Sequence, residues 1–194
     1  IIDAAIRAKK AGGGAKTRAI VIYPMNALAN SQAKELEGYL GSATGGLVTY
    51  ARYTGQESNE DRELIKANPP DILLTNFMMP ELLMTRQSDL DQKVLQNCEG
   101  LQFIVLDELH TYRGRQGADV AMLMRRLRSR IGESTNPPLC IGTSATMASE
   151  GAQHEKNEAV ARIASQIFGA DIGPDAVVTE TLKRATNPIK IGGN

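Results

Sequence analysis

Short apolar runs alternate along the chain with longer segments in which apolar residues recur at helical spacing. The runs are rich in β-branched residues and have the length of strands that are buried on both faces. We expect strands at residues 19–23, 47–53, 72–75, 103–106 and 139–142. Because helical segments separate these runs, the pattern predicts an α/β fold with a mainly parallel central sheet and helices on both faces.

Two of the helical segments have a clear apolar side. Their periodic residues are Val120, Leu123, Met124, Leu127 and Ile131 in one segment and Val160, Ile163, Ala164, Ile167 and Phe168 in the other. This spacing predicts helices that face the core. A further helix is expected to start at Ser58, which forms a capping-box pattern with Asp61, and to run through Lys66 until Pro69-Pro70 ends it.

The two ends of the chain suggest a piece of a longer protein. The first residues, 1–10, have a helical pattern with neither an initiator Met nor a signal-peptide layout, so we expect the chain to start inside a helix. Residues 173–194 are expected to lead out of the domain. Val177, Val178 and Thr179 predict a last short strand, and the remainder is expected to form an exit segment.

Length and composition indicate one folded domain, residues 1–194, with a sizeable core. No apolar run approaches the roughly 18 residues that span a bilayer, so we expect no membrane insertion. Lys plus Arg and Asp plus Glu number 22 each, so no net charge marks a nucleic-acid binder. A protein that contacts phosphates through backbone N–H groups, helix N-termini and hydroxyls does not need a basic surface, however.

The cysteines and one histidine carry little functional signal. Cys98 and Cys140 lie far apart without metal-ligand spacing, which predicts reduced thiols and is consistent with a cytoplasmic location. His154 has no Cys or His nearby in sequence and is expected at the surface. Arg125, with Arg126, Arg128 and Arg130, lies on the polar side of its helix, where it could contact nucleic acid or face solvent or another domain.

Two adjacent carboxylates, Asp107 and Glu108, follow the apolar run at residues 103–106. Acids at the end of a buried parallel strand can reach a bound metal. In a site that handles phosphates, one acid holds Mg²⁺, usually through water, and its neighbour positions the water that attacks the γ-phosphate. We assign the first role to Asp107 and the second to Glu108. The alternative is a strand that simply meets a polar loop or an acidic helix start.

The run at residues 139–142 is followed by Thr143-Ser144-Ala145-Thr146. Ser144 and Thr146 present two hydroxyls around a small residue, at the end of a strand expected beside the acidic one. Either hydroxyl could instead cap the next helix. His110 lies two residues after Glu108, where it has either a coupling or a structural role.

The sequence Asp107-Glu108-Leu109-His110, with the later Ser144-Ala145-Thr146, resembles the DExH box and the following coupling motif of superfamily 2 helicases. The resemblance implies a RecA-like, P-loop NTPase-type three-layer sandwich, with ATP and Mg²⁺ as cofactors. It also implies that Ser144 and Thr146 hydrogen-bond to the carboxylates and to His110. The sequence from Asp107 to Gly114 resembles that of large DNA helicases of the Lhr-like and MrfA-like kind, which favours DNA over RNA.

The same resemblance implies a nucleic-acid face, at three strand ends. Pro24, Asn26 and Ala27 fall in the motif that is often Pro-Thr-Arg-Ala-Leu-Ala, although Met25-Asn26 here replaces Thr-Arg. Thr54 with Gly55, and Thr75 with Asn76, follow the next two strands. Gly permits close backbone approach and Thr hydroxyls offer neutral phosphate contacts. Taken singly, the first block is also compatible with a plain helix cap, and the other two with ordinary turns. Single-stranded or duplex nucleic acid is the expected partner.

The chain contains no P-loop of the form G-x-x-x-x-G-K-[ST]. The segment at residues 12–17 is a poor match, because Ala15 replaces the Gly before Lys16 and the segment precedes a strand rather than following one. The family resemblance places the start of the chain just after the P-loop and its end before a second RecA-like domain, the expected partner. We therefore expect the isolated piece to be inactive.

Two other classes of function are compatible with parts of the sequence. A RecA-like module that no longer hydrolyses ATP could serve as a docking or regulatory surface, but such a module has no chemical need for both Asp107 and Glu108. A metal-dependent nuclease or phosphatase would need further acids or histidines at strand ends. Asp71 lies at the start of its strand, which is the wrong end.

Overall fold

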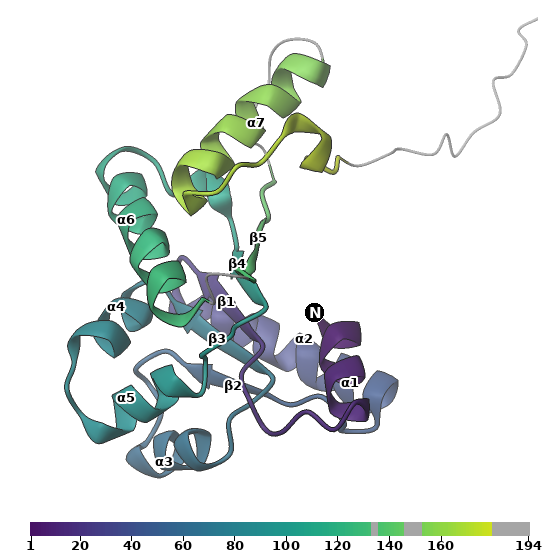
Figure 1. The fold of residues 1–194 in the computed structure, drawn as a ribbon, viewed down its shortest axis with the longest axis vertical. Helices are drawn as coiled ribbons and strands as arrows, with labels where there is room; N and C mark the ends of the chain where they lie inside the picture. The colour runs from purple at the N-terminus through teal and green to yellow at the C-terminus, as the bar shows by residue number, and fades with distance from the viewer. Residues whose placement is uncertain (133–135, 146–152, 180–194) are drawn as a thin grey trace, which may run out of the picture.

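A single parallel sheet organises the chain. The structure is a computed structural model that describes residues 1–132, 136–145 and 153–179. In these residues the strands are β1 (Ala19–Tyr23), β2 (Tyr50–Tyr53), β3 (Ile72–Asn76), β4 (Phe103–Leu106) and β5 (Leu139–Gly142). All neighbours pair in parallel in the order β2-β3-β1-β4-β5 (Figure 1). The predicted parallel sheet is confirmed, except that β2 starts three residues later than expected.

Helices cover both faces of this sheet (Figure 1). The helices are α1 (Ile2–Lys10), α2 (Asn26–Thr44), α3 (Asn59–Ala67), α4 (Met78–Thr85), α5 (Asp89–Gln96), α6 (Gly114–Ile131) and α7 (Gln153–Phe168), with 3₁₀ turns η1 (Leu109–Thr111) and η2 (Pro174–Ala176). Helices α1 and α2 lie on one face, and α3 to α6 lie on the other. Helix α7 packs on α6. The predicted three-layer α/β sandwich is therefore confirmed.

The alternation of side chains along each strand divides the apolar core in two. On β1, Ala19 and Tyr23 pack toward α1 and α2 with residues such as Ala29. Ile20 and Ile22 point the other way, into the larger core that contains the buried side of α6. Each strand can therefore be apolar along its whole length, as expected for a sheet buried on both faces.

The predicted helix signals are confirmed where the structure describes them. Ser58 and Asp61 form a reciprocal capping box at the start of α3. All five periodic residues of α6 are buried, namely Val120, Leu123, Met124, Leu127 and Ile131. On α7, Ala164, Ile167 and Phe168 are buried, whereas Val160 and Ile163 are half-buried.

The strand predicted at Val177, Val178 and Thr179 is wrong. These residues follow the turn η2 and adopt no strand conformation, and Val178 is 94% exposed. The physical reason is the position of this segment. It lies against α7, away from the sheet, so its β-branched residues have no strand to pair with. Within the residues that the structure describes, no helix has both the length and the apolar character needed to cross a bilayer.

The glycine-rich loop between α1 and β1 turns its carbonyl groups inward. The Arg18 guanidinium is nearly buried; it donates to the carbonyls of Gly14 (3.0 Å) and Lys16 (2.9 Å) and to the Asp71 carboxylate (2.7 Å). A phosphate-binding loop would direct its N–H groups at the ligand instead. This geometry agrees with the poor match of residues 12–17 to a P-loop sequence.

Candidate nucleotide-hydrolysis and nucleic-acid site

The parallel pairing brings the predicted site residues to one edge of the sheet. Tyr23 at the end of β1 is in register with Asn76 on β3, and Leu106 at the end of β4 is in register with Gly142 on β5. All strands run the same way, so the residues that follow them emerge together. Ligands in open α/β sheets bind outside this carboxyl edge.

Asp107 and Glu108 stand where β4 leaves the sheet. The N–H of Asp107 still donates to the carbonyl of Ile22 at 2.9 Å, which extends the ladder by one residue. Glu108 then adopts a left-handed conformation with φ 53° and ψ 51°, and it is the one non-glycine residue with positive φ among those described. This conformation costs about 1–2 kcal/mol for an L-residue. Thr111 compensates in part by donating its N–H and hydroxyl to the Glu108 carbonyl, each at 2.8 Å.

The Glu108 carboxylate is incompletely paired. Its Oε2 atom is buried and has no hydrogen-bond partner among the described residues. His110 Nδ1 lies 3.2 Å from this oxygen, but the angles do not form a hydrogen bond, and the contact is an ion pair only when the imidazole is protonated. A buried acceptor without a partner is uncommon and is frequently a functional atom. The carboxylate thus keeps one acceptor atom that the described residues do not use.

Thr143, which the sequence analysis did not select, links the two acids. Its hydroxyl donates to Asp107 Oδ1 and accepts the N–H of Glu108 at 3.2 Å. Its own backbone bonds to the N–H of Leu109 and to the carbonyl of Leu106. Leu106 and Gly142 are partners in the parallel pairing of β4 and β5, so the residues that follow them, Asp107 and Thr143, leave the sheet side by side. The position of Thr143 directly after its strand was the signal that could have identified it.

His110 and Ser144 meet beside the acids. Ser144 Oγ lies 3.2 Å from His110 Nδ1, and the tautomer of the imidazole decides which atom donates. The structure brings these two predicted residues together. Thr146 lies outside the described residues. The hydroxyl that bonds to a carboxylate here is that of Thr143, not that of Ser144.

Asn76 connects the strand ends assigned to nucleic acid. Its Nδ2 donates to Asn26 Oδ1 at 2.6 Å and to the Thr54 carbonyl at 2.9 Å. Its Oδ1 accepts the N–H groups of Met78 and Met79 at the start of α4. With both ends of its amide engaged, Asn76 holds three strand ends in a fixed arrangement.

The two predicted threonines are less accessible than expected. The Thr75 side chain is 1% exposed and donates to the Tyr53 carbonyl at 2.6 Å, so it supports the sheet and does not face a ligand. Glu57 occupies the turn after β2, where its carboxylate accepts from the Thr54 hydroxyl and from the N–H groups of Thr54 and Gly55. Burial alone raises the pKa of Glu57, but these hydrogen bonds outweigh it and lower that pKa.

The residues assigned to nucleic acid at this edge are themselves uncharged, although Arg62 donates to the Gly55 carbonyl at 3.2 Å and the Glu57 carboxylate lies in the same turn. Pro24 and Asn26 are half-buried, whereas Ala27 and Gly55 are exposed. Met25 and Met78 flank the bonded pair of asparagines and are each more than half exposed. These positions present amide, backbone and apolar groups, and Asn26 stands at the position where the family motif often has Arg.

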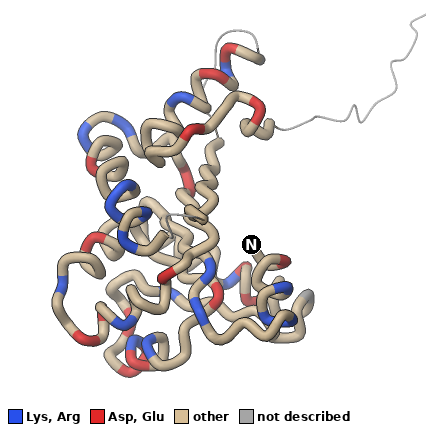
Figure 2. The backbone as a smooth tube through the Cα atoms, in the orientation of Figure 1, with Lys and Arg blue, Asp and Glu red and all other residues tan. Residues whose placement is uncertain are grey.

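The arginines of α6 face neighbouring helices. Arg125 donates to the Gln166 carbonyl and Arg128 to the carbonyls of Phe168 and Gly169, near the end of α7. Arg126 pairs with Glu81 on α4. Figure 2 shows a basic stretch along α6, with acidic and basic positions interleaved over much of the remaining tube. These three arginines thus contribute to helix packing within this part of the chain.

The field at the acidic edge is negative. Burial and then the charges of Asp107 and Glu35 raise the pKa of Tyr23 to about 12. Burial, Asp107 and Glu108 likewise raise the pKa of Tyr112. No cluster of three or more potential metal ligands occurs in the described part of the chain. Two carboxylates nevertheless suit Mg²⁺, which is commonly held by one or two protein acids, waters and substrate phosphates.

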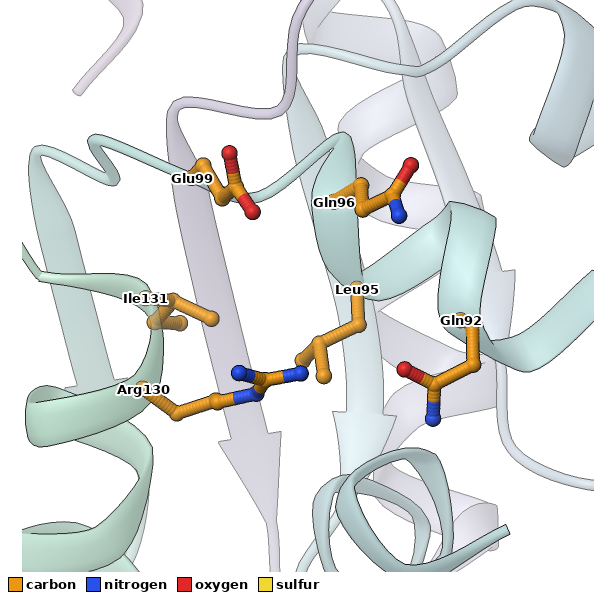
Figure 3. A pocket seen from close by; sticks show the side chains of 6 residues that line it. All are labelled: Gln92, Leu95, Gln96, Glu99, Arg130 and Ile131. Carbon is orange, nitrogen blue, oxygen red and sulfur yellow. The ribbon is translucent and has the colours of Figure 1, made fainter. Parts of the chain in front are cut away.

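A small hollow lies between α5 and α6, where Arg130 extends beside Leu95 toward Gln92 (Figure 3). Ile131 at its rim accepts the N–H of Gly100, which precedes β4, so the hollow is at the amino edge of the sheet. It is therefore at the opposite edge from the acids and takes no part in the site.

Together, the parallel sheet, the acid pair at the end of a central strand and the hydroxyl-bearing strand beside it define a RecA-like domain of the nucleotide-hydrolysing class. Comparison with known families is specific. The family model of DEAD/DEAH box helicases matches residues 3–154, and the chain belongs to this family.

Known relatives and solved structures agree with this assignment. The uncharacterized ATP-dependent helicase YprA of Bacillus subtilis (strain 168) is 34% identical over 131 residues, which cover 68% of this chain and 17% of YprA. The crystal structure of the DUF1998 helicase MrfA superposes with a TM-score of 0.66 at 28% identity, over 84% of this chain and 24% of MrfA. The crystal structure of MrfA bound to DNA and AMPPNP superposes with a TM-score of 0.60 at 31% identity, over 79% of this chain and 19% of that chain. The chain thus spans less than a quarter of these proteins.

Proposed function

We propose that this chain is part of the first RecA-like domain of a longer ATP-dependent helicase or translocase that acts on DNA. In this proposal it supplies the carboxylates for hydrolysis and a surface that contacts the nucleic acid. The P-loop, which this sequence does not contain, and a second RecA-like domain would be supplied by the longer protein. Free thiols at Cys98 and Cys140 support a cytoplasmic location.

The observation that carries the proposal is the acid pair. Asp107 is fixed by the Thr143 hydroxyl, whereas Glu108 has a buried oxygen with no hydrogen-bond partner among the described residues. A purely structural acid pair would have its oxygens satisfied, because an unpaired buried acceptor costs about 1–3 kcal/mol. The difference between the two acids supports separate roles in one reaction.

These roles follow from what each side chain contacts. Mg²⁺, when bound with ATP, neutralises charge on the phosphates, and Asp107 would hold it, usually through water. Glu108 would accept a proton from the water that attacks the γ-phosphate. His110 and Ser144, 3.2 Å apart, would connect the acids to the strand-binding edge, a role also proposed for Thr146.

For the nucleic-acid side, the proposal relies on Asn26, Gly55 and Asn76 with the flanking Pro24 and Ala27. Thr54 would act through its backbone carbonyl, which is already bonded to Asn76. DNA is favoured because MrfA, 31% identical over the superposed region, has been solved bound to DNA. Since these groups are neutral, their contribution to binding should have little salt dependence.

The test is nucleic-acid-stimulated ATPase activity of the full-length protein, comparing wild type with Glu108→Gln. We expect the substitution to lower the turnover number by about 10²–10⁴-fold, the usual contribution of a general base. ATP binding should remain. Glu99→Gln is the matched control, since Glu99 is an exposed glutamate at the hollow of the amino edge and should leave turnover unchanged.

The outcomes separate the two leading functions. Stimulated turnover that disappears only in Glu108→Gln supports the motor. If wild type binds DNA or a protein but never hydrolyses ATP, the proposal is wrong and a docking or regulatory module takes its place.

A further inference from the structure

Thr143 is hydrogen-bonded to Asp107 and to the backbone of Leu106, Glu108 and Leu109. Its hydroxyl lies between the Asp107 carboxylate and the Glu108 amide, and its backbone bonds on either side of them. The family motif that guided the sequence analysis begins one residue later, at Ser144, and gives no role to this position.

The chemistry of a hydroxyl fixes the direction of these bonds. A threonine hydroxyl has one proton to donate and two lone pairs to accept with. The backbone N–H of Glu108 can only donate, so it occupies a lone pair of Thr143 Oγ1, and the single proton points to Asp107 Oδ1. The chain of bonds therefore runs from Glu108 N–H through Thr143 to Asp107.

This chain of bonds spans the strained turn. Glu108 is held in the left-handed conformation, and the N–H groups of Glu108 and Leu109 are both bound by Thr143, one by its hydroxyl and the other, at 2.8 Å, by its carbonyl. Thr143 therefore sets the side chain of one acid and the backbone of the other. The backbone bonds to Leu106 and Leu109 would persist without the hydroxyl.

We propose that Thr143 is a positioning residue for hydrolysis: its hydroxyl orients the Asp107 carboxylate toward the metal and holds Glu108 in place for the attacking water. This inference rests on the proposed function. Groups that orient metal-binding acids typically contribute about 10–100-fold to metal affinity or activity. Thr143 contacts neither metal nor water in this role and acts through the two acids.

The experiment compares wild type, Thr143→Val and Thr143→Ser in the full-length protein. Valine keeps the branched shape and both backbone bonds but removes the hydroxyl, whereas serine keeps the hydroxyl. The first readout is Mn²⁺ binding in the presence of AMPPNP, followed by electron paramagnetic resonance. The second is the Mg²⁺ concentration that gives half-maximal ATPase activity. Thr85→Val, which removes an exposed hydroxyl bonded within α4, is the control.

We expect Thr143→Val to weaken Mn²⁺ binding and to raise the half-maximal Mg²⁺ concentration, each by about tenfold. Thr143→Ser and Thr85→Val should stay within about threefold of wild type. DNA binding without nucleotide should be equal in all four proteins. A variant that had lost its fold would instead bind DNA more weakly. Amide exchange at Glu108 should accelerate in Thr143→Val alone.

Three results would overturn the inference. The first is a Thr143→Val protein with the metal dependence of wild type, and the second is a Thr143→Ser protein as weak as Thr143→Val, because the hydroxyl would then not be the active group. The third is a wild type that binds no metal with AMPPNP and has no turnover, in which case the proposed function fails as well. Loss of turnover in Glu108→Gln alongside an unaffected Thr143→Val would reject only the role of Thr143.

Discussion

The acids at the two edges of the sheet have contrasting partners. At the amino edge, Asp71 is 1% exposed and binds Lys9, Arg18 and the N–H and hydroxyl of Thr49. At the carboxyl edge, Asp107 has the hydroxyl of Thr143, and one oxygen of Glu108 has no hydrogen-bond partner among the described residues. The amino edge thus pairs its acid with two cations, whereas the carboxyl edge leaves one acceptor oxygen of Glu108 unused by the described residues.

Chain direction explains this difference. Parallel strands place every entering segment at one edge and every leaving segment at the other. Helix α1 supplies Lys9 and the segment that enters β1 supplies Arg18, and their charges pair with Asp71 and join α1 to the sheet. The leaving loops supply hydroxyls and amides, which orient acids without cancelling their charge. Asp71 therefore contributes to stability, whereas Glu108 keeps an oxygen without a hydrogen-bond partner among the described residues.

The largest expected effect is on stability, from Asp71→Asn. Loss of this carboxylate leaves Lys9 and the nearly buried Arg18 without their common partner. Breaking a buried ion pair typically costs about 3–5 kcal/mol. Urea unfolding followed by circular dichroism would measure it. Asp89→Asn is the control, because Asp89 pairs with Lys66 at the exposed surface and should change stability little. A small effect at Asp71 would remove the contrast between the edges.

Acid should reproduce part of that loss in the wild type. Burial of Asp71 alone raises its pKa, but hydrogen bonds from Lys9 and Thr49 outweigh it and lower the pKa below its ordinary value. A depressed pKa in the folded state means that the contribution to stability is complete above the unfolded value of about 3.9 and is lost as pH falls through the folded value. The difference in unfolding free energy between wild type and Asp71→Asn should therefore narrow below about pH 4. A constant difference from pH 6 to pH 3 would contradict the assignment.

A smaller effect is expected at the carboxyl edge, from Asn76. Asn76→Ala removes the acceptor for the first two amides of α4 and should cost about 0.5–2 kcal/mol, the usual contribution of a helix cap. Asn76→Asp keeps this acceptor but loses the donor to Asn26 and adds a negative charge.

The two variants separate structure from binding. Asn76→Asp should be more stable than Asn76→Ala in thermal unfolding, yet it should bind single-stranded DNA more weakly in fluorescence anisotropy. If both variants bind DNA as wild type does, Asn76 only supports the fold, and the nucleic-acid surface lies elsewhere.

The sequence predicted the strands and the acid pair well because both are local signals. An apolar run ending in Asp107-Glu108 specifies a buried strand and its exit without knowledge of any neighbour. By contrast, the sequence selected Thr75, whose hydroxyl is bonded to the Tyr53 carbonyl, and did not select Thr143, whose hydroxyl is bonded to the Asp107 carboxylate. Strand pairing decides which hydroxyl contacts which group, and the local sequence does not show that pairing. The strand expected at Val177 failed for the same reason, because its pattern carries no information about a partner.

The smallest expected effect is on the labelling rates of the two thiols. Cys98 serves here as a probe of the amino edge and is not itself substituted. Cys98 is fully buried there, and burial raises its pKa to about 12, while Cys140 on β5 is partly exposed. Only thiolates react readily, so a disulfide reagent at pH 8 should label Cys140 first and Cys98 only when the fold opens. Asp71→Asn should accelerate labelling of Cys98 at least tenfold, whereas Glu108→Gln should not, because Glu108 lies at the opposite edge and one of its oxygens has no hydrogen-bond partner among the described residues. Equal labelling of Cys98 in both variants would show that the two edges are coupled and that their acids are not independent.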